Sequence, residues 1–179
     1  VGTVLMQPEE EPMEEPEVDE VQEKEEQETE KQIKEDPEHQ VEELLDSLSV
    51  EEKVAQLFVV LPEQLVGNVS RVTAAGEATR EAINNRPVGG IVYLESNLVS
   101  PEQTKTMLQN VQQYSMDRLN LPMFLCVDEE GGQVSRAASN PKMKMTVYPS
   151  AQEVGRTYNN KKIVQMGEDT GKGIKRAWI

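Results

Sequence analysis

Two apolar runs of strand length, separated by one capped helix, constrain the fold of this chain most strongly. Val88–Leu94 is rich in β-branched and aromatic residues, and Met123–Val127 is wholly apolar. Between them, Ser100 is a cap residue, Pro101 occupies the first helical position, and the helix is predicted to run to Arg118. Because both strands are apolar on both faces, the order strand, helix, strand predicts a parallel sheet covered by helices, an α/β architecture.

Further elements are predicted around this unit. Helical spacing begins at Val41, and Ser49 with Glu52 forms a capping box for a second helix. We expect three side chains of that second helix to form a buried stripe: Val54, Leu57 and Phe58. The remaining predicted elements are a short strand at Val59–Leu61, a helix at Ala74–Asn85 and a helix within Ala151–Gly167.

The amino-terminal part of the chain differs sharply in composition from the rest. Up to Glu43 there are 18 acidic residues and 3 lysines, a net charge of −15, whereas the remainder carries 15 acidic and 15 basic residues. We therefore expect residues 1–40 to be a disordered acidic leader, a solvated spacer or alternatively a binding segment, followed by one domain over residues 41–179. With no basic patch, the chain is not expected to bind nucleic acid.

Cysteine and hydropathy place few limits on location. Cys126 is the only cysteine, so no internal disulfide can form, and its place in an apolar strand indicates a buried thiol. No stretch approaches the ~20 apolar residues of a membrane span. The chain begins with valine, and we expect an apolar secretion segment upstream of Val1 and an extracellular or envelope-anchored protein, with a cytoplasmic protein as the alternative.

Polar residues gather where the second apolar strand ends. Asp128 follows the strand directly, and Gly131-Gly132 allows the backbone to turn and to approach a ligand closely. A carboxylate at the carboxyl end of a parallel strand lies where α/β folds bind ligands, so Asp128 is expected to accept hydrogen bonds from hydroxyl groups. The alternative is that Asp128 caps the amides of the turn.

Four neighbouring residues are weaker candidates. Glu129 and Glu130 are adjacent, so their side chains diverge and at least one is expected to face a helix or loop. Arg136 either points into the pocket as a multi-donor group or pairs with one of these glutamates at the surface. Asn97 either lines the same rim of the pocket as Asp128 or caps a turn.

Three consecutive carboxylates do not match the spacing of a calcium loop, and zinc would need His or Cys nearby, so no metal is expected.

Nucleophilic catalysis by a Ser-His or Cys-His pair has no support. His39 is the only histidine, and it lies in the predicted leader. Gly89-Gly90 precedes its strand, which is the wrong side for a dinucleotide-binding loop.

Four ordered segments resemble a known family. They are Leu48–Phe58 (LSVEEKVAQLF), Val88–Tyr93 (VGGIVY), Ser100–Thr104 (SPEQT), and Val127–Arg136 (VDEEGGQVSR) with Tyr148-Pro149 after it. Together they resemble the amino-terminal barrel of glycoside hydrolase family three, with the closer likeness to its bacterial β-N-acetylglucosaminidase branch. The family arginine that often follows Gly-Gly is Gln133 here.

The resemblance implies the amino-terminal part of a TIM-type (β/α)8 barrel and a retaining β-N-acetylglucosaminidase without a cofactor. The implied substrate is a terminal N-acetylglucosamine of an oligosaccharide or muropeptide. The family residues matching Asp128 and Arg136 belong to the motif that binds the sugar, and Glu129 and Glu130 lie between them. The family's nucleophile aspartate and acid/base histidine have no counterpart here, so we expect an incomplete, inactive member. The alternative is a non-catalytic sugar-binding or scaffold protein.

Overall fold

The computed structural model describes residues 36–67 and 69–178. The predicted leader lies outside the described residues, apart from residues 36–40. The chain divides into two compact units, residues 1–47 and residues 48–179. In the first unit, α2 spans Pro37–Ser47, and the backbone amide of Glu38 donates to the Asp36 carboxylate at 3.0 Å. The helix therefore begins four residues before the predicted start at Val41.

The second unit contains a three-stranded parallel sheet in the order β1-β2-β3. Its strands are β1 (Val59–Val60), β2 (Gly90–Tyr93) and β3 (Phe124–Val127). A two-stranded antiparallel hairpin, β4 (Glu129–Gly131) and β5 (Val134–Ser135), follows β3. The helices are α3 (Val50–Ala55), α4 (Pro62–Val66), α5 (Glu77–Asn85), α6 (Pro101–Leu119), α7 (Ala151–Gly155) and α8 (Asn160–Trp178), with short 3-10 turns η1 (Glu95–Asn97) and η2 (Pro141–Met143).

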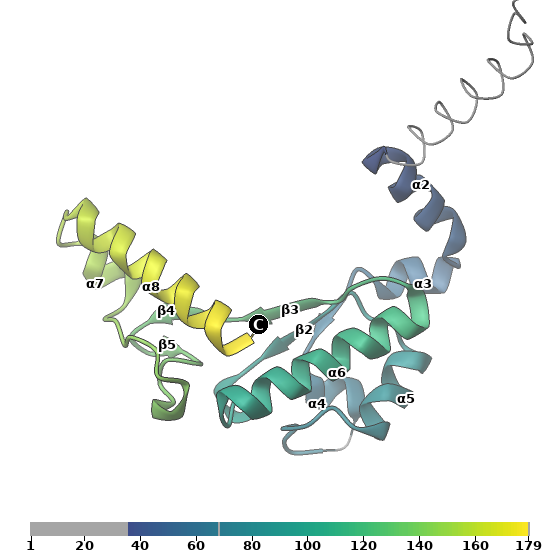
Figure 1. Ribbon diagram of the computed structural model, residues 1–179, viewed down its shortest axis with the longest axis horizontal. Coiled ribbons are helices and arrows are strands. Elements are labelled where there is room, and N and C mark those ends of the chain that lie inside the picture. Colours follow the sequence, from purple (N-terminus) through teal and green to yellow (C-terminus); the bar gives the residue numbers. More distant parts are fainter. Residues whose placement is uncertain (1–35, 68, 179) are drawn as a thin grey trace, which may run out of the picture. The chain divides into compact units, whose positions relative to one another are not determined.

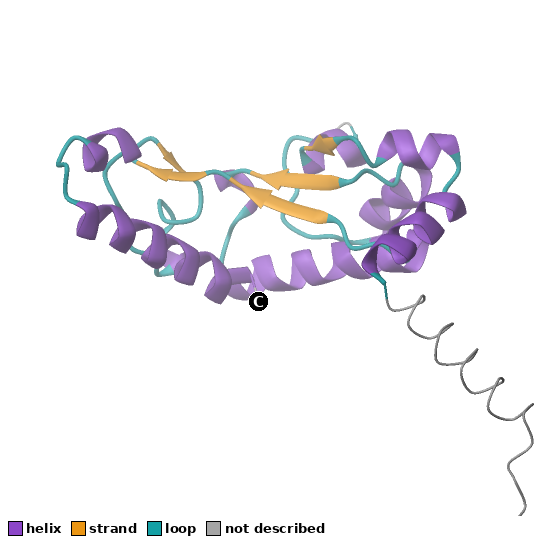
Figure 2. Cartoon of the chain, turned by 90° about the horizontal axis from the view of Figure 1, so that it is seen from above, coloured by secondary structure: helices purple, strands orange, loops and turns teal. Residues whose placement is uncertain are grey.

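The sheet and its crossover helix confirm the predicted strand, helix, strand unit. β2 pairs with β3 in parallel, with Ile91 opposite Leu125 and Tyr93 opposite Val127. Ser100 caps α6 by accepting from the amide of Gln103. Figure 1 shows α6 running alongside β2 and β3, and Figure 2 shows the long helices on one side of these strands. A parallel pair needs such a long crossover, and the helix covers the sheet face that it crosses.

The core lies between the sheet and this helix layer. Ile91 and Tyr93 of the central strand are 0% and 1% exposed, and they share one core cluster with Met107, Leu108 and Val111 of α6. Tyr93 also meets Trp178 of α8 edge to face, with ring centroids 6.3 Å apart. The central strand therefore ties α6 and α8 to the same face of the sheet.

The opposite face of the sheet is apolar and uncovered within the described residues. A Cβ on Gly90 would lie 3.0 Å from Cβ of Phe124 and 3.1 Å from Cγ2 of Val59, so both side chains flank Gly90 on this face. Phe124 is 74% exposed and Val59 is 50% exposed. Parallel sheets are normally covered on both faces, so this face lacks its expected cover.

The predicted buried stripe on the second helix is wrong. Val54, Leu57 and Phe58 are 49%, 82% and 55% exposed. The helical period identifies side chains that share a face, but it does not supply a neighbour for that face. The helix predicted within Ala151–Gly167 is confirmed by α7, and α8 begins in the same range and continues to Trp178.

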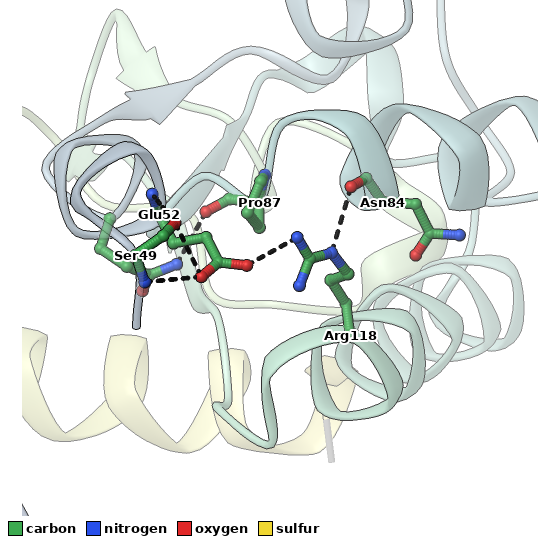
Figure 3. Close-up of polar contacts among 6 residues, drawn as sticks. Ser49, Glu52, Asn84, Pro87 and Arg118 are labelled. Carbon is green, nitrogen blue, oxygen red and sulfur yellow. Dashed lines mark hydrogen bonds and ion pairs between the residues drawn. The ribbon is translucent and has the colours of Figure 1, made fainter. Parts of the chain in front are cut away.

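Arg118 links three helices at the end of the sheet where the strands begin, through one ion pair and one hydrogen bond. Arg118 of α6 contacts Glu52 of α3 at 2.6 Å, and its Nε donates to the carbonyl of Asn84 in α5 at 3.1 Å (Figure 3). Glu52 also completes the predicted capping box with Ser49. Hydrogen bonds from Ser49 and then from Arg118 hold the pKa of Glu52 below its ordinary value.

Within the described residues, no helix is both long and apolar enough to cross a membrane.

The uncovered face predicts self-association of the 179-residue chain. Exposed apolar side chains on a sheet with free edges favour aggregation. Phe124→Lys should reduce self-association measured by sedimentation velocity. Tyr158→Lys should not, because Tyr158, although 91% exposed, lies in the turn between α7 and α8 and not on the sheet. A wild-type monomer that unfolds cooperatively in calorimetry would contradict this prediction.

The Arg118 contacts predict an acid-sensitive stability. Arg118→Met should lower the urea midpoint at neutral pH, because it removes both the Glu52 ion pair and the bond to Asn84. The pKa of Glu52 is lowered in the folded state. The stability that Glu52 adds to the folded state is therefore fully present above the ordinary glutamate pKa of about 4.3, and it is lost as the pH falls through the lowered pKa. The difference between wild type and variant should therefore shrink in acid.

The matched control is Arg80→Met, which removes the exposed Glu77–Arg80 pair within α5. Exposed pairs contribute little, so this variant should keep the wild-type midpoint. Equal loss in both variants would show that the link between helices has no special role.

Candidate functional site

The candidate site lies at the carboxyl end of β3, where the chain enters the β4–β5 hairpin. Asp128 is the residue between β3 and β4. Its backbone carbonyl accepts a hydrogen bond from the amide of Arg136 at 3.4 Å, which closes the hairpin. The hairpin pairing shifts register between Glu129 and Gly131. The two residues that the sequence singles out are therefore backbone neighbours, although eight positions separate them.

The Asp128 carboxylate is exposed, and no described group donates a hydrogen bond to it. The alternative role as a cap of the turn amides thus has no hydrogen bond behind it in the described residues. A rigid strand end delivers an acceptor with unused capacity, which suits a ligand with hydroxyl groups. Contact of Asp128 with a sugar remains a prediction.

Glu129 has a different environment from its neighbours. One carboxylate oxygen accepts a hydrogen bond from the hydroxyl of Ser135. The other accepts from the backbone amides of Ala137 at 2.7 Å and Ala138 at 3.1 Å. This carboxylate therefore braces the segment that follows β5 and has little remaining capacity for a ligand.

Glu130 is exposed, and no described group pairs with its side chain. As predicted from their adjacency, Glu129 and Glu130 have separate environments, and Glu129 is the one that faces a loop. A ligand contact by either glutamate stays a prediction.

Arg136 is half-buried, and its Nε is a buried donor without a hydrogen-bond partner. Neither Glu129 nor Glu130 forms an ion pair with it in the described part of the chain, so the surface-pair alternative is not observed. Leaving a buried donor unsatisfied costs about 1–3 kcal/mol.

The two glycines permit a close approach within the chain. Gly131 and Gly132 have φ values of +78° and +59°. A Cβ on Gly131 would lie 2.3 Å from the carbonyl oxygen of Pro149, and one on Gly132 would lie 3.0 Å from Cβ of Ser150. The predicted turn is confirmed, and the approach that the structure shows is to the chain's own Pro149 and Ser150.

Tyr148 fixes the far end of the same loop. Its carbonyl accepts from the Gly132 amide at 2.9 Å, and its hydroxyl donates to Asp169 of α8 at 2.6 Å. That hydrogen bond raises the pKa of Tyr148 and lowers the pKa of Asp169. The loop from Arg136 to Pro149 is thus anchored to both the hairpin and α8.

Asn97 adopts the turn role. It is fully buried, and its Oδ1 accepts from the amide of Leu94 at 2.8 Å. Its Nδ2 donates to Glu63 at 2.6 Å and to the carbonyl of Val72 at 2.8 Å. Glu63 was not predicted from the sequence, and its carboxylate also accepts from the amide of Val72 at 2.8 Å. The sequence signal that could have identified Glu63 is its position just after the strand Val59–Val60.

No group of three or more His, Cys, Asp or Glu side chains is arranged to hold a metal ion in the described part of the chain. Asp128 and Arg136 can form hydrogen bonds with a ligand. The Asp128 carboxylate after β3 is an acceptor, and the Arg136 guanidinium after β5 is a donor.

The described domain is similar to known proteins. Residues 49–177 match the family model of the glycosyl hydrolase family 3 N terminal domain. Among solved structures, the chain is similar to a glycoside hydrolase family 3 beta-N-acetylglucosaminidase from Paenibacillus sp. str. FPU-7, at 25% identity and a TM-score of 0.61. That match covers 73% of this chain and 23% of the Paenibacillus chain. A comparison with curated proteins gave no significant match.

The glycine geometry predicts a strong position dependence for alanine substitution. Gly131→Ala should disorder the hairpin and its loop, because positive φ alone costs a non-glycine residue roughly 1–2 kcal/mol and the new Cβ would collide with Pro149. Faster amide exchange over residues 128–150 is the expected readout. Gly171→Ala is the control, since a Cβ there has open space in α8 and should not affect exchange in the hairpin. Unchanged exchange in Gly131→Ala would contradict the prediction.

Proposed function

The chain belongs to glycosyl hydrolase family 3, and from this premise we propose that the protein acts in the release of terminal N-acetylglucosamine from oligosaccharides of cell-wall or chitin origin. The described domain is α/β and corresponds to the amino-terminal part of a TIM-type barrel. The observation that supports the proposal is the exposed Asp128 carboxylate at the carboxyl end of β3, to which no described group donates a hydrogen bond, with Arg136 next to it across the hairpin backbone. The described structural relative is a beta-N-acetylglucosaminidase, which supports this choice of sugar.

In the proposed mechanism, Asp128 accepts hydrogen bonds from two sugar hydroxyls and Arg136 donates to an oxygen of the same ring. These contacts orient the sugar, and they accelerate the reaction to the extent that they strengthen in the transition state. A retaining reaction also needs a carboxylate nucleophile and a second group as acid/base. We propose that the reacting groups come from parts of the barrel not represented here, because this chain spans less than a quarter of its structural relative.

The alternative is a non-catalytic sugar-binding or scaffold protein. It uses the same Asp128 and Arg136 contacts but forms and breaks no glycosidic bond.

We also propose an extracellular or envelope location, for which the acidic leader would serve as a spacer. Fractionation of cells expressing the native gene tests this location directly, and recovery only in the cytoplasm would overturn it.

A chimera tests the proposed role of Asp128. Residues 49–177 would replace the matching segment of the Paenibacillus enzyme, and hydrolysis of a chromogenic N-acetylglucosaminide would be measured. Asp128→Ala should lower kcat/KM by about a hundredfold or more, because each charge-assisted hydrogen bond contributes ~1.5–3 kcal/mol. The control is Lys161→Ala, an exposed residue at the start of α8.

The 179-residue chain alone should show no turnover in the same assay. A folded chimera in which Asp128→Ala keeps the wild-type kcat/KM would remove Asp128 from the site. Binding of the sugar without turnover in the folded chimera would favour the non-catalytic alternative.

A further inference from the structure

The carboxamide of Asn140 joins two loops at the carboxyl end of the sheet. Asn140 lies four residues after Arg136 and directly before η2. Its Nδ2 donates to the carbonyls of Leu98 at 2.7 Å and Val99 at 3.2 Å, which belong to the loop after β2. Its Oδ1 accepts from the amide of Lys142 at 3.0 Å and so caps η2. One side chain therefore holds the loop after β5 to the loop after β2.

The loop after β2 is a firm base for this contact. Leu98 is 2% exposed, and the amide of Val99 donates to Oε1 of Gln103 at 2.9 Å. Nε2 of Gln103 donates to the carbonyls of Asn97 at 3.1 Å and Thr73 at 2.6 Å. Because Asn97 is itself fully buried and hydrogen-bonded, the two carbonyls that the carboxamide binds cannot shift without breaking these bonds.

The segment between Arg136 and Asn140 is compact. Ala137 is 0% exposed and Ala138 is 4% exposed, and both of their backbone amides donate to Glu129. The amide of Asn140 donates to the carbonyl of Ala137 at 3.1 Å. A change in the position of Asn140 is therefore transmitted through this segment to Arg136.

Little else fixes the guanidinium of Arg136. In the part of the chain that the structure describes, no group forms a hydrogen bond or an ion pair with it, whereas the guanidinium of Arg118 is held by Glu52. The amide of Arg136 donates to the carbonyl of Asp128 at 3.4 Å, which is long for a hydrogen bond. The place of the guanidinium thus depends on the segment that carries it, and so on the contacts of Asn140.

We propose that Asn140 is a positioning residue for Arg136, and that its carboxamide holds the loop after β5 where the guanidinium reaches the sugar. The inference rests on the proposed function, in which Arg136 donates to the sugar ring. Asn140 acts through Arg136 and needs no contact with the sugar itself. Loss of its donor therefore weakens sugar binding and raises KM, while the reacting groups elsewhere in the barrel keep their rate.

Asn140→Asp tests this role in the folded chimera. The new side chain keeps the shape and an oxygen that caps η2, but it places a carboxylate oxygen instead of a donor opposite the carbonyls of Leu98 and Val99. The Kd of N-acetylglucosamine, measured by calorimetry, and the KM of the chromogenic substrate should both rise about tenfold, because two hydrogen bonds are lost. The change in kcat should be smaller than the change in KM.

A double-mutant cycle with Arg136→Met separates positioning from general stability. Once the guanidinium is absent, Asn140→Asp has little left to change, so in the Arg136→Met background the Kd should rise less than about twofold. An equal rise in both backgrounds would show that Asn140 supports the fold without positioning Arg136, and it would overturn the proposal.

Asn110→Asp is the matched control. Asn110 is also half-buried, and its Nδ2 also donates to a backbone carbonyl, that of Ala75 at 3.0 Å, but it joins the middle of α6 to the segment before α5. This control should lose thermal stability and keep the Kd. If Asn140→Asp fails to fold, the cycle is measured with Asn140→Ser, because serine can cap η2 but is too short to reach both carbonyls. An unchanged Kd in the folded Asn140 variant would contradict the positioning role.

The outcome is separable from the fate of the proposed function. Sugar binding with the expected coupling but without hydrolysis would leave the positioning role standing and remove the activity. Hydrolysis with additive effects of the two substitutions would leave the activity standing and remove Asn140 from its role. A folded chimera that neither binds nor hydrolyses the sugar would overturn both.

Discussion

The structure depends on the burial of one face of the central strand. Ile91 and Tyr93 are almost fully enclosed by the helix layer, and β1 and β3 pair with β2 on either side in parallel. Parallel pairing requires each strand to start from the same edge, so the connections between strands are long and contain α5 and α6. All three strands therefore end at the opposite edge, and the loops that carry Asn97, Asp128 and Arg136 emerge there together. The location of the candidate site is a consequence of the strand pairing.

The same topology explains the uncovered apolar face. Side chains alternate along a strand. Ile91 and Tyr93 face the helices, whereas Gly90 and its neighbours Val59 and Phe124 face the other way. In a TIM-type barrel this second face points to the interior, where side chains from alternate strands fill the centre in layers. Val59 and Phe124 are thus the residues of a barrel core rather than of a surface. Their exposure is a property of three strands taken without the partners that the barrel fold provides.

Prediction from the sequence succeeded for those features that depend on local chemistry. The capping box of Ser49 and Glu52, the start of α6 at Pro101, and the strands β2 and β3 follow from residue types at fixed spacing. It failed where a distant neighbour decides the outcome. Val54, Leu57 and Phe58 have the correct period for burial, but no element covers them in the described residues. The separate environments of Glu129 and Glu130 were predictable, but which one braces the loop depends on amides at Ala137 and Ala138, eight and nine residues later.

The motif after β3 combines a braced backbone with a carboxylate that no described group uses. Glu129 uses both carboxylate oxygens on the chain itself. Gly131 lies so close to Pro149 that a Cβ there would be 2.3 Å from the Pro149 carbonyl oxygen, which excludes any side chain. These contacts hold the loop without using the Asp128 carboxylate or Nε of Arg136. An ion pair between Asp128 and Arg136 would brace the loop further, but it would occupy the groups that the proposed sugar binding uses. Because Glu129 and the glycines brace the loop, the Asp128 carboxylate receives no hydrogen bond from a described group, as the proposed recognition of a polar ligand requires.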